Sequence, residues 1–292
     1  MLAPIVIFAF NRPESLSNLK ETLERNKLYE ESEKYVFVDG TRNKEEYAKV
    51  EKVISIAREI TPNVTIAEKN KGLGSSIIEG VTTVINQYHK VIVLEDDLVC
   101  SENFLSYMNQ ALDFYQDNPQ IFSICGYGLK IKRPVGYIGD VYLSGRSSSW
   151  GWGTWKDRWE QVDWEVKDWK ELSLNRKMQK AFNENGSDMF AMLKGYIEGR
   201  NRSWAIRFCY SQFKLGKYSI HPFLSKIGNN GFGEDATNCK QTYSRFKSDF
   251  DRINNDSFIF PNSLELNKQI LVACSRYHNI MSRIYSKIRN FF

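Results

Sequence analysis

The chain has 292 residues, of which 42% are hydrophobic and 26% are charged. This length and composition are typical of a globular protein of one large or two small domains, and they exclude a disordered or low-complexity chain. The formal net charge of +5 is a mild excess, which suits an anionic ligand or an anionic membrane surface without requiring either. No basic block interleaved with aromatic residues and no nucleic-acid-binding motif is visible, so we expect no nucleic acid partner.

The N-terminal segment and the cysteines indicate the cellular location of the protein. No stretch approaches the roughly 18 consecutive apolar residues that a membrane-spanning helix needs. The segment Met1–Phe10 lacks a basic region and a small-residue cleavage site, so we expect no signal peptide. The five cysteines are odd in number, lie far apart and form no Cys-x-x-Cys pair. A cytoplasmic protein is therefore the simplest expectation.

The first hundred residues alternate short apolar runs with amphipathic stretches. This alternation predicts an α/β fold with a buried parallel sheet, in which ligands bind beyond the carboxyl ends of the strands. The predicted strands are Ile5–Phe10, Tyr35–Val38, Val64–Ala67 and Val91–Leu94.

Helices are predicted between these runs and beyond them. The first begins at Pro13, and the third begins at Ser75 or Ser76. Past residue 100 the pattern becomes α+β, with a helix from Ser101 and a short strand over Ile121–Cys125.

Three carboxylates, Glu95, Asp96 and Asp97, directly follow the fourth predicted strand. Like charges repel at such a position and their desolvation is costly, and a divalent cation would relieve both. Hard oxygen ligands select Mg²⁺ or Mn²⁺, which proteins often hold with one or two carboxylates and substrate phosphates. The alternative is an acidic turn in which one carboxylate caps the next helix.

Two further segments follow predicted strands. Asp39 ends the second strand, where an acidic side chain can accept hydrogen bonds from a nucleoside base or ribose. A simple Asp-Gly turn is the alternative. The loop that begins with Lys71 and Gly72 is only half of a dinucleotide-binding fingerprint, but as the start of a helix it suits a phosphate or a sugar hydroxyl.

The tryptophans mark a second region of interest. All seven lie between residues 150 and 204, and six of them lie in Trp150–Trp169. Gly151 beside Trp150 and Trp152 permits a close approach of the backbone to a ligand, and flat aromatic faces are surfaces on which sugar rings stack. We therefore expect these three residues to bind a saccharide, although a role in the core is the alternative.

Together these motifs resemble inverting nucleotide-sugar glycosyltransferases of the GT-A fold, specifically bacterial family 2-like enzymes related to the Golgi N-acetylglucosaminyltransferase I. The resemblance implies a mostly parallel central sheet with flanking helices and a smaller acceptor-side sheet. It further implies a nucleotide-sugar-binding half over 1–100, an acceptor-binding half over 101–240, and an extension over 241–292. The matching segments are Pro4–Leu16, Val38–Gly40, Asn70–Ser76, Val91–Asp97 and Trp150–Trp159, with weaker matches at Ser203–Arg207 and Gly228–Cys239.

The same resemblance implies roles for individual residues. Asp97 would be the direct ligand of Mn²⁺ or Mg²⁺, completed by diphosphate oxygens and water. The nucleotide would be that of a UDP-sugar, and its sugar would pass to a saccharide acceptor. The donor site would comprise Asn11, Arg12 and Asp39 at the nucleotide, Lys71 and Gly72 at the diphosphate or sugar, Asp96 at the ribose, and Glu95 beside them.

The catalytic base is where this sequence departs from the pattern of the family. Relatives often carry an aspartate before Ser-Trp-Ala, whereas Asn201 and Arg202 stand there in this chain. A histidine that relatives carry in the later glycine-rich segment is Asn238 here, which puts an additional protein ligand to the metal in doubt. The candidates for the base are Glu198 as the replacement, then Asp188, Glu234 and Asp235.

The C-terminal residues form a basic amphipathic pattern. An interfacial helix on an anionic bilayer has this pattern, and a terminal helix docked on the domain is the alternative. Membrane binding would suit a polyprenyl-linked saccharide acceptor at the inner membrane surface, as in capsule or O-antigen synthesis. On a helical wheel, one arc holds Tyr277, Ile280, Met281, Ile284, Tyr285, Ile288 and Phe292, flanked by Arg276, Arg283 and Lys287 on one side and Arg289 on the other.

Two other functions are alternatives to the glycosyltransferase hypothesis. A sugar-nucleotide pyrophosphorylase needs a glycine-rich loop after its first strand, and Ile5–Pro13 contains no glycine. A non-catalytic protein that binds carbohydrate or nucleotide sugar remains open because the base is unassigned.

Overall fold

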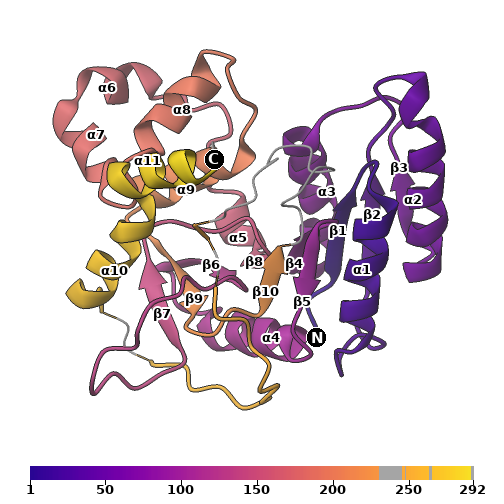
Figure 1. Ribbon diagram of the computed structural model, residues 1–292, viewed down its shortest axis with the longest axis horizontal. Helices are drawn as coiled ribbons and strands as arrows, with labels where there is room; N and C mark the ends of the chain where they lie inside the picture. The colour runs from indigo at the N-terminus through magenta and orange to yellow at the C-terminus, as the bar shows by residue number, and fades with distance from the viewer. Residues whose placement is uncertain (230–244, 247, 263–264, 291–292) are drawn as a thin grey trace.

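The computed structural model describes residues 1–229, 245–246, 248–262 and 265–290. Its strands are β1 (Ile5–Ala9), β2 (Lys34–Val38), β3 (Val64–Ile66), β4 (Lys90–Glu95), β5 (Leu98–Cys100), β6 (Ile121–Cys125), β7 (Val141–Ser144), β8 (Trp152–Trp155), β9 (Tyr218–Pro222) and β10 (Ile227–Asn229). They form an eight-stranded sheet in the order β3-β2-β1-β4-β8-β6-β9-β7 and a two-stranded sheet of β10 and β5 (Figure 1).

The helices flank the large sheet and form a lobe beside its second half (Figure 1). In chain order they are α1 (Pro13–Glu24), the 3-10 helix η1 (Lys44–Glu46), α2 (Tyr47–Ile60), α3 (Leu73–Tyr88), α4 (Phe104–Tyr115), α5 (Lys156–Trp159), α6 (Trp169–Leu174), α7 (Arg176–Asn183), α8 (Met189–Ile197), α9 (Trp204–Lys214), α10 (Lys268–His278) and α11 (Ile280–Arg289).

The N-terminal half is the predicted parallel sheet. Strands β3, β2, β1 and β4 pair in parallel, and the residues of β1 alternate between two cores. Ile5 and Ile7 pack with α1, α2 and α4, whereas Val6 and Phe8 pack with α3 and the tryptophan cluster. The central strands are therefore covered on both faces, which explains why they are continuous apolar runs.

Two helices begin at residues other than those predicted. Helix α3 begins at Leu73 rather than at Ser75 or Ser76, because Gly72 ends the preceding loop with a positive φ of 77°. Helix α4 begins at Phe104 rather than at Ser101, because Ser101 follows directly on β5 and donates its hydroxyl to Asn103.

The second half of the sheet is mixed. Strand β8 is inserted antiparallel between β4 and β6, β6 pairs in parallel with β9, and β9 pairs antiparallel with β7. The predicted class is confirmed: the fold is α/β, with a large, mostly parallel central sheet, flanking helices and a smaller antiparallel sheet.

The tryptophan segment serves mainly the core. Trp152 is 1% exposed, and its ring stacks between Trp159 and Trp204 at centroid distances of 5.9 and 4.9 Å. The expectation that Trp152 stacks on a sugar is therefore wrong, because both faces of the ring are covered. Gly151 has a φ of 55°, and a Cβ at this position would lie 2.5 Å from Cγ1 of Ile227. The backbone conformation and the packing against Ile227 therefore explain the glycine without the approach of a ligand.

The C-terminal extension contains two helices where one was expected. Asn279 has an extended backbone and separates α10 from α11, so Tyr277 belongs to α10 and the rest of the predicted arc to α11. Phe292 lies outside the described residues. None of the helices in the described part of the chain is long and apolar enough to cross a membrane.

The packing of Trp152 makes a prediction about stability. Trp152→Ala should lower the free energy of unfolding by about 3–5 kcal/mol, because it removes a large ring from a closed stack. Trp150→Ala, at a half-buried ring, should cost clearly less. Urea denaturation followed by circular dichroism measures both, and equal losses would contradict the assignment of Trp152 to the core.

Candidate functional site

The carboxyl ends of β1, β2 and β4 bring the predicted donor-site residues to one edge of the sheet. Arg12, three residues after β1, forms ion pairs with Asp96 and with Asp97, the latter at 2.9 Å. Asp96 also accepts the backbone N–H of Phe10 at 3.2 Å and is 2% exposed. Both oxygens of Asp96 are thus engaged, one by Arg12 and the other by the backbone of Phe10.

The acidic groups of this cluster outnumber its single cationic side chain. Desolvation and repulsion from Asp97 and Asp96 raise the pKa of Glu95 to about 8. Burial raises the pKa of Asp96 to about 6, although the charge of Arg12 acts in the opposite direction. One guanidinium therefore does not neutralise the three carboxylates, and further positive charge would stabilise them.

Magnesium or manganese fits the donor atoms of this cluster. Within the described part of the chain, Oδ1 of Asp97 and the carboxylate of Glu95 make no hydrogen bond, and the Asp97 side chain is 15% exposed. The described residues contain no group of three or more His, Cys, Asp and Glu side chains arranged to hold a metal. An ion here would need oxygens from a substrate, as is usual for Mg²⁺.

Asp39 shapes the loop that precedes α3. Its carboxylate accepts the backbone N–H groups of Gly40, Lys71 and Gly72 at 2.8–2.9 Å. These bonds fix the start of a 16-residue helix, whose first N–H groups favour an anion. The Lys71 ammonium pairs with Glu79 at the surface.

Arg42 and Glu46 form a polar cluster with Asn11 next to Phe10, and the sequence analysis did not identify these two residues. The Asn11 amide donates to Glu46 at 3.0 Å, and Glu46 also accepts from the backbone and side chain of Arg42. The Arg42 guanidinium lies over the Phe10 ring, 4.9 Å from its centroid. Hydrogen bonds from Arg42 lower the pKa of Glu46, so it is firmly ionised. The only sequence signal was the i, i+4 spacing of these opposite charges after the second strand.

Two of the predicted catalytic bases have cationic partners. Glu198 ends α8 at the surface, where it pairs with Arg200 and with Lys194. Asp188 is buried, and although burial acts in the opposite direction, the charge of Arg146 at 2.7 Å holds the pKa of Asp188 below its usual value. Glu234 and Asp235 lie outside the described residues.

The loop between α8 and α9 comes close to the start of α3. A Cβ at Gly74 would lie 2.8 Å from the carbonyl oxygen of Arg202, and a Cβ at Gly72 would lie 3.8 Å from Nη1 of Arg202. Arg202 is exposed. Arg202 is thus a cationic side chain near the N-terminus of α3, and the hydrogen bonds of Asp39 fix that end of the helix.

A cavity of about 290 Å³ lies in the second half of the molecule, and Trp150 is among its lining residues. The register pairs Trp152 with Val93 of β4, so Trp150 lies two residues further on, toward the end of β4 that carries Glu95. The Trp150 ring contacts Tyr127 edge to face at 4.7 Å. Trp150 is thus a lining residue that lies toward the Glu95 end of β4, whereas Glu95, Asp96 and Asp97 do not line the cavity.

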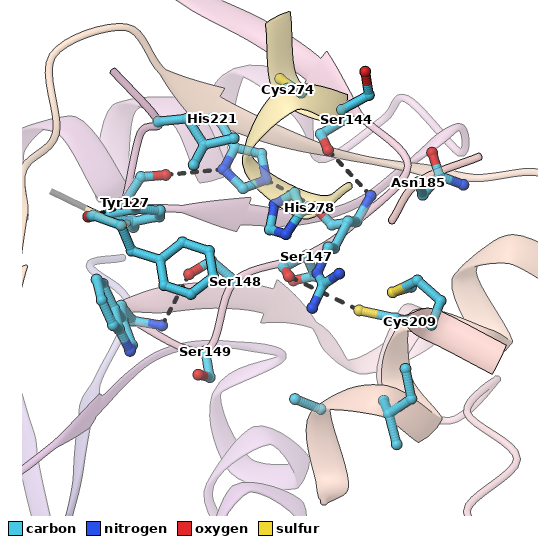
Figure 2. A pocket seen from close by; sticks show the side chains of 18 of the residues that line it. Tyr127, Ser144, Ser147, Ser148, Ser149, Asn185, Cys209, His221, Cys274 and His278 are labelled. Carbon is cyan, nitrogen blue, oxygen red and sulfur yellow. Dashed lines mark hydrogen bonds between the residues drawn. The ribbon is translucent and has the colours of Figure 1, made fainter. Parts of the chain in front are cut away.

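Two histidines give this cavity its polar character (Figure 2). The ring nitrogens of His221 lie 2.8 and 3.0 Å from the carbonyl oxygens of Tyr127 and Arg146, so a doubly protonated ring satisfies both. Burial opposes that charge, but neighbouring Cys125 and these carbonyl groups raise the pKa of His221. His278 is 9% exposed, and its buried Nδ1 has no hydrogen-bond partner among the described residues. Serine hydroxyls complete the wall, including Ser147, Ser148 and Ser149.

Comparison with known proteins gives distant likenesses only. No protein-family profile and no curated protein matches the chain. The mannosyltransferase PcManGT from Pyrobaculum calidifontis, solved with GDP-Man and Mn²⁺, is 8% identical with a TM-score of 0.36, over 54% of this chain and 46% of that one. S. aureus TarS 1–349 is 10% identical with a TM-score of 0.34, over 53% and 47%. Its complex with UDP is 13% identical with a TM-score of 0.31, over 47% and 38%.

The chain thus spans about half the length of these solved proteins, or less. Because the TM-scores are low, we draw no functional inference from these likenesses. The relation to N-acetylglucosaminyltransferase I that the motifs indicate finds no support in them.

The ion pairs of Arg12 make a prediction. Arg12→Met should lower the free energy of unfolding by about 3–5 kcal/mol, because it leaves the Asp96 carboxylate buried without its partner. Adding Asp96→Asn should recover part of that loss. Arg200→Met, which removes an exposed partner of Glu198, should cost less than about 1 kcal/mol. Chemical denaturation measures all three variants, and a loss for Arg12→Met as small as that for Arg200→Met would refute the buried pair.

Proposed function

We propose that this chain is a glycosyltransferase that moves a sugar from a nucleoside diphosphate to a saccharide acceptor. The observation that carries the proposal is an acidic cluster at the sheet edge together with a cavity whose lining residue Trp150 lies toward the Glu95 end of β4. An acidic cluster and a helix N-terminus suit a charged donor, and the cavity beside Trp150 suits a neutral polyhydroxylated acceptor. Transfer between two substrates requires that the donor site and the acceptor site lie side by side.

On the donor side, we assign the diphosphate to the N-terminus of α3. Gly72, Lys71 and Arg202 lie there. Asp39 accepts the backbone N–H groups of Lys71 and Gly72, so the phosphate would meet the N–H groups of the first turn of α3 and the side chains of Lys71 and Arg202. Asn11 and Asp39 would face the nucleoside, which we infer to be uridine. Asp97, with Glu95 beside it, would hold Mn²⁺ or Mg²⁺, which neutralises charge on the departing diphosphate.

On the acceptor side, we assign the saccharide to the cavity that Trp150 lines. The Trp150 ring offers an apolar face, while the serine hydroxyls and the His278 imidazole offer hydrogen bonds. Burial, and then the charge of Arg146, lowers the pKa of His278 to about 3, so its ring is neutral at neutral pH and can accept a hydrogen bond from a hydroxyl group. A polyprenyl-linked acceptor would place the enzyme in the synthesis of a bacterial surface polysaccharide such as capsule.

Inversion requires a base that deprotonates the acceptor hydroxyl while it attacks the face opposite the diphosphate. Asp188 is held by Arg146, and Glu198 is paired at the surface. Glu234 and Asp235 lie outside the described residues. We infer that one of these two is the base, because Asp188 and Glu198 both have cationic partners.

A second candidate function is non-catalytic binding of nucleotide sugar or carbohydrate. The observation in its favour is that Glu198 and Asp188 both have cationic partners. Sugar transfer or donor hydrolysis by the purified protein would exclude this candidate, and its absence despite tight donor binding would favour it.

Donor binding has a direct test. UDP with Mn²⁺ should raise the melting temperature, because a ligand that binds only the folded state stabilises it by about 2.7 kcal/mol at one hundred times its Kd. Asp97→Asn should abolish the shift that depends on Mn²⁺. Asp117→Asn, at an exposed carboxylate on another surface, should leave it unchanged.

GDP, CDP and dTDP are tested beside UDP to identify the nucleotide. A folded protein that responds to none of the four, with or without Mn²⁺, would count decisively against the proposed donor site.

Acceptor binding predicts a different mutant phenotype. Trp150→Ala should raise the KM for the acceptor about fivefold, because the loss of one aromatic face is worth roughly 1 kcal/mol. The thermal shift with UDP and Mn²⁺ should remain. Phe114→Ala, at an exposed aromatic ring on α4, is the matched control. A Trp150→Ala enzyme with unchanged acceptor KM, or one that loses donor binding equally, would argue against the cavity as the acceptor site.

A further inference from the structure

Helix α11 is oriented opposite to an ordinary surface helix. Its apolar side chains point outward: Ile280, Met281, Ile284 and Ile288 are 60%, 75%, 48% and 50% exposed. Ser286 on the opposite side is 6% exposed. An amphipathic helix that docks on its own domain buries the apolar stripe. The alternative of a terminal helix packed by its apolar face is therefore wrong.

A groove beside α11 carries a concentration of positive charge. It lies between the segment 130–135, α10 and the start of α11, and Met281 forms part of its wall. Among the described residues, no acidic side chain lines this groove. Its cations are Lys130, Lys132, Arg133, Arg245 and Arg276.

The balance of charge remains positive when neighbouring acids are counted. Asp249 pairs with Lys130, and Asp140 pairs with Arg133. Lys132 and Arg276 form no ion pair within the described part of the chain. The sequence 266–292 contains five lysines and arginines and no aspartate or glutamate.

Exposed apolar side chains also occur on the other side of the groove. Val135 is fully exposed and Ile138 is 77% exposed, in the segment that joins β6 to β7. Two segments distant in sequence, 130–138 and α11, therefore present the same combination of apolar and basic side chains. In Figure 1 these segments lie on the side of the molecule away from β3 and α2.

We propose that segment 130–138, α10 and α11 form a face that docks on a lipid bilayer containing anionic headgroups. The apolar side chains of α11 and of segment 130–138 enter the boundary between headgroups and acyl chains. Lys132, Arg276 and the basic flank of α11 meet the lipid phosphates. Interfacial helices with a basic polar side bind anionic bilayers by this combination of apolar burial and charge.

Charge complementarity distinguishes the bilayer from a second copy of this chain. A symmetric dimer through this face would bring the basic grooves of two copies together, and like charges at an interface are unfavourable. An anionic bilayer instead supplies negative charge opposite every basic side chain.

Cosedimentation with vesicles, without substrate, tests the proposal. The full chain should bind phosphatidylcholine vesicles that contain phosphatidylglycerol, bind pure phosphatidylcholine weakly, and be released by salt. The double variant Lys132→Gln, Arg276→Gln should bind the anionic vesicles about twenty-five-fold more weakly, because each basic side chain near the surface is worth roughly fivefold. Lys49→Gln with Lys52→Gln, at exposed positions of α2, removes the same charge and should have little effect.

The apolar side chains have their own matched pair of variants. Ile284→Ser with Ile288→Ser should abolish vesicle binding, whereas Leu174→Ser with Leu215→Ser, at exposed leucines elsewhere, should not. Circular dichroism checks that every variant is folded. Equal binding to both kinds of vesicle, or equal loss in target and control variants, overturns the proposal. A concentration-dependent dimer that Ile284→Ser with Ile288→Ser dissociates, without any vesicle binding, overturns it in favour of a second copy.

Discussion

The interaction on which the candidate site depends is the pairing of Arg12 with Asp96 and Asp97. Strand β4 lies near the middle of the sheet between β1 and β8, so the carboxylates that follow it are close together and partly removed from water. Such a cluster repels itself, and the guanidinium from the end of β1 offsets part of that repulsion. The offset is incomplete, because desolvation and the neighbouring carboxylates still raise the pKa of Glu95 to about 8. The site is thus arranged for additional positive charge near Asp97.

The insertion of β8 connects this cluster with the cavity. A parallel neighbour of β4 would run its carboxyl end to the same edge, whereas antiparallel β8 brings its amino end there. Trp150, which precedes β8, therefore lies toward the Glu95 end of β4, while Trp152 and Trp155 pack into opposite cores. A short strand rich in tryptophan thus contributes to both cores, and the half-buried ring of Trp150 that precedes it lines the proposed acceptor site.

The sequence predicted the parts of this arrangement that depend on local patterns. The central strands β1 and β4 are buried and apolar, and β2 and β3 follow in the alternating pattern of strand and helix, so the parallel pairing and the edge that carries Asp39 and Asp97 could be inferred. The role of Trp152 could not, because a buried stack and a sugar-binding surface have the same aromatic composition. Nor could the cavity, which joins Tyr127, Arg146 and His278 from distant parts of the chain. The outward side of α11 was also beyond prediction, because a helical wheel gives an arc without its direction.

Helix α10 connects the two proposals. At the spacing of one helical face, Leu271, Cys274, Ser275 and His278 line the cavity, whereas Ala273, Arg276 and Tyr277 line the basic groove. One short helix therefore separates the proposed acceptor site from the proposed membrane face. An acceptor whose saccharide lies in the cavity while its lipid remains in the bilayer would therefore need to span only the width of α10. Docking through α11 would also hold His278 in place, because the C-terminus of α10 is tied to Ser187 by a hydrogen bond of 2.8 Å and leads directly into α11.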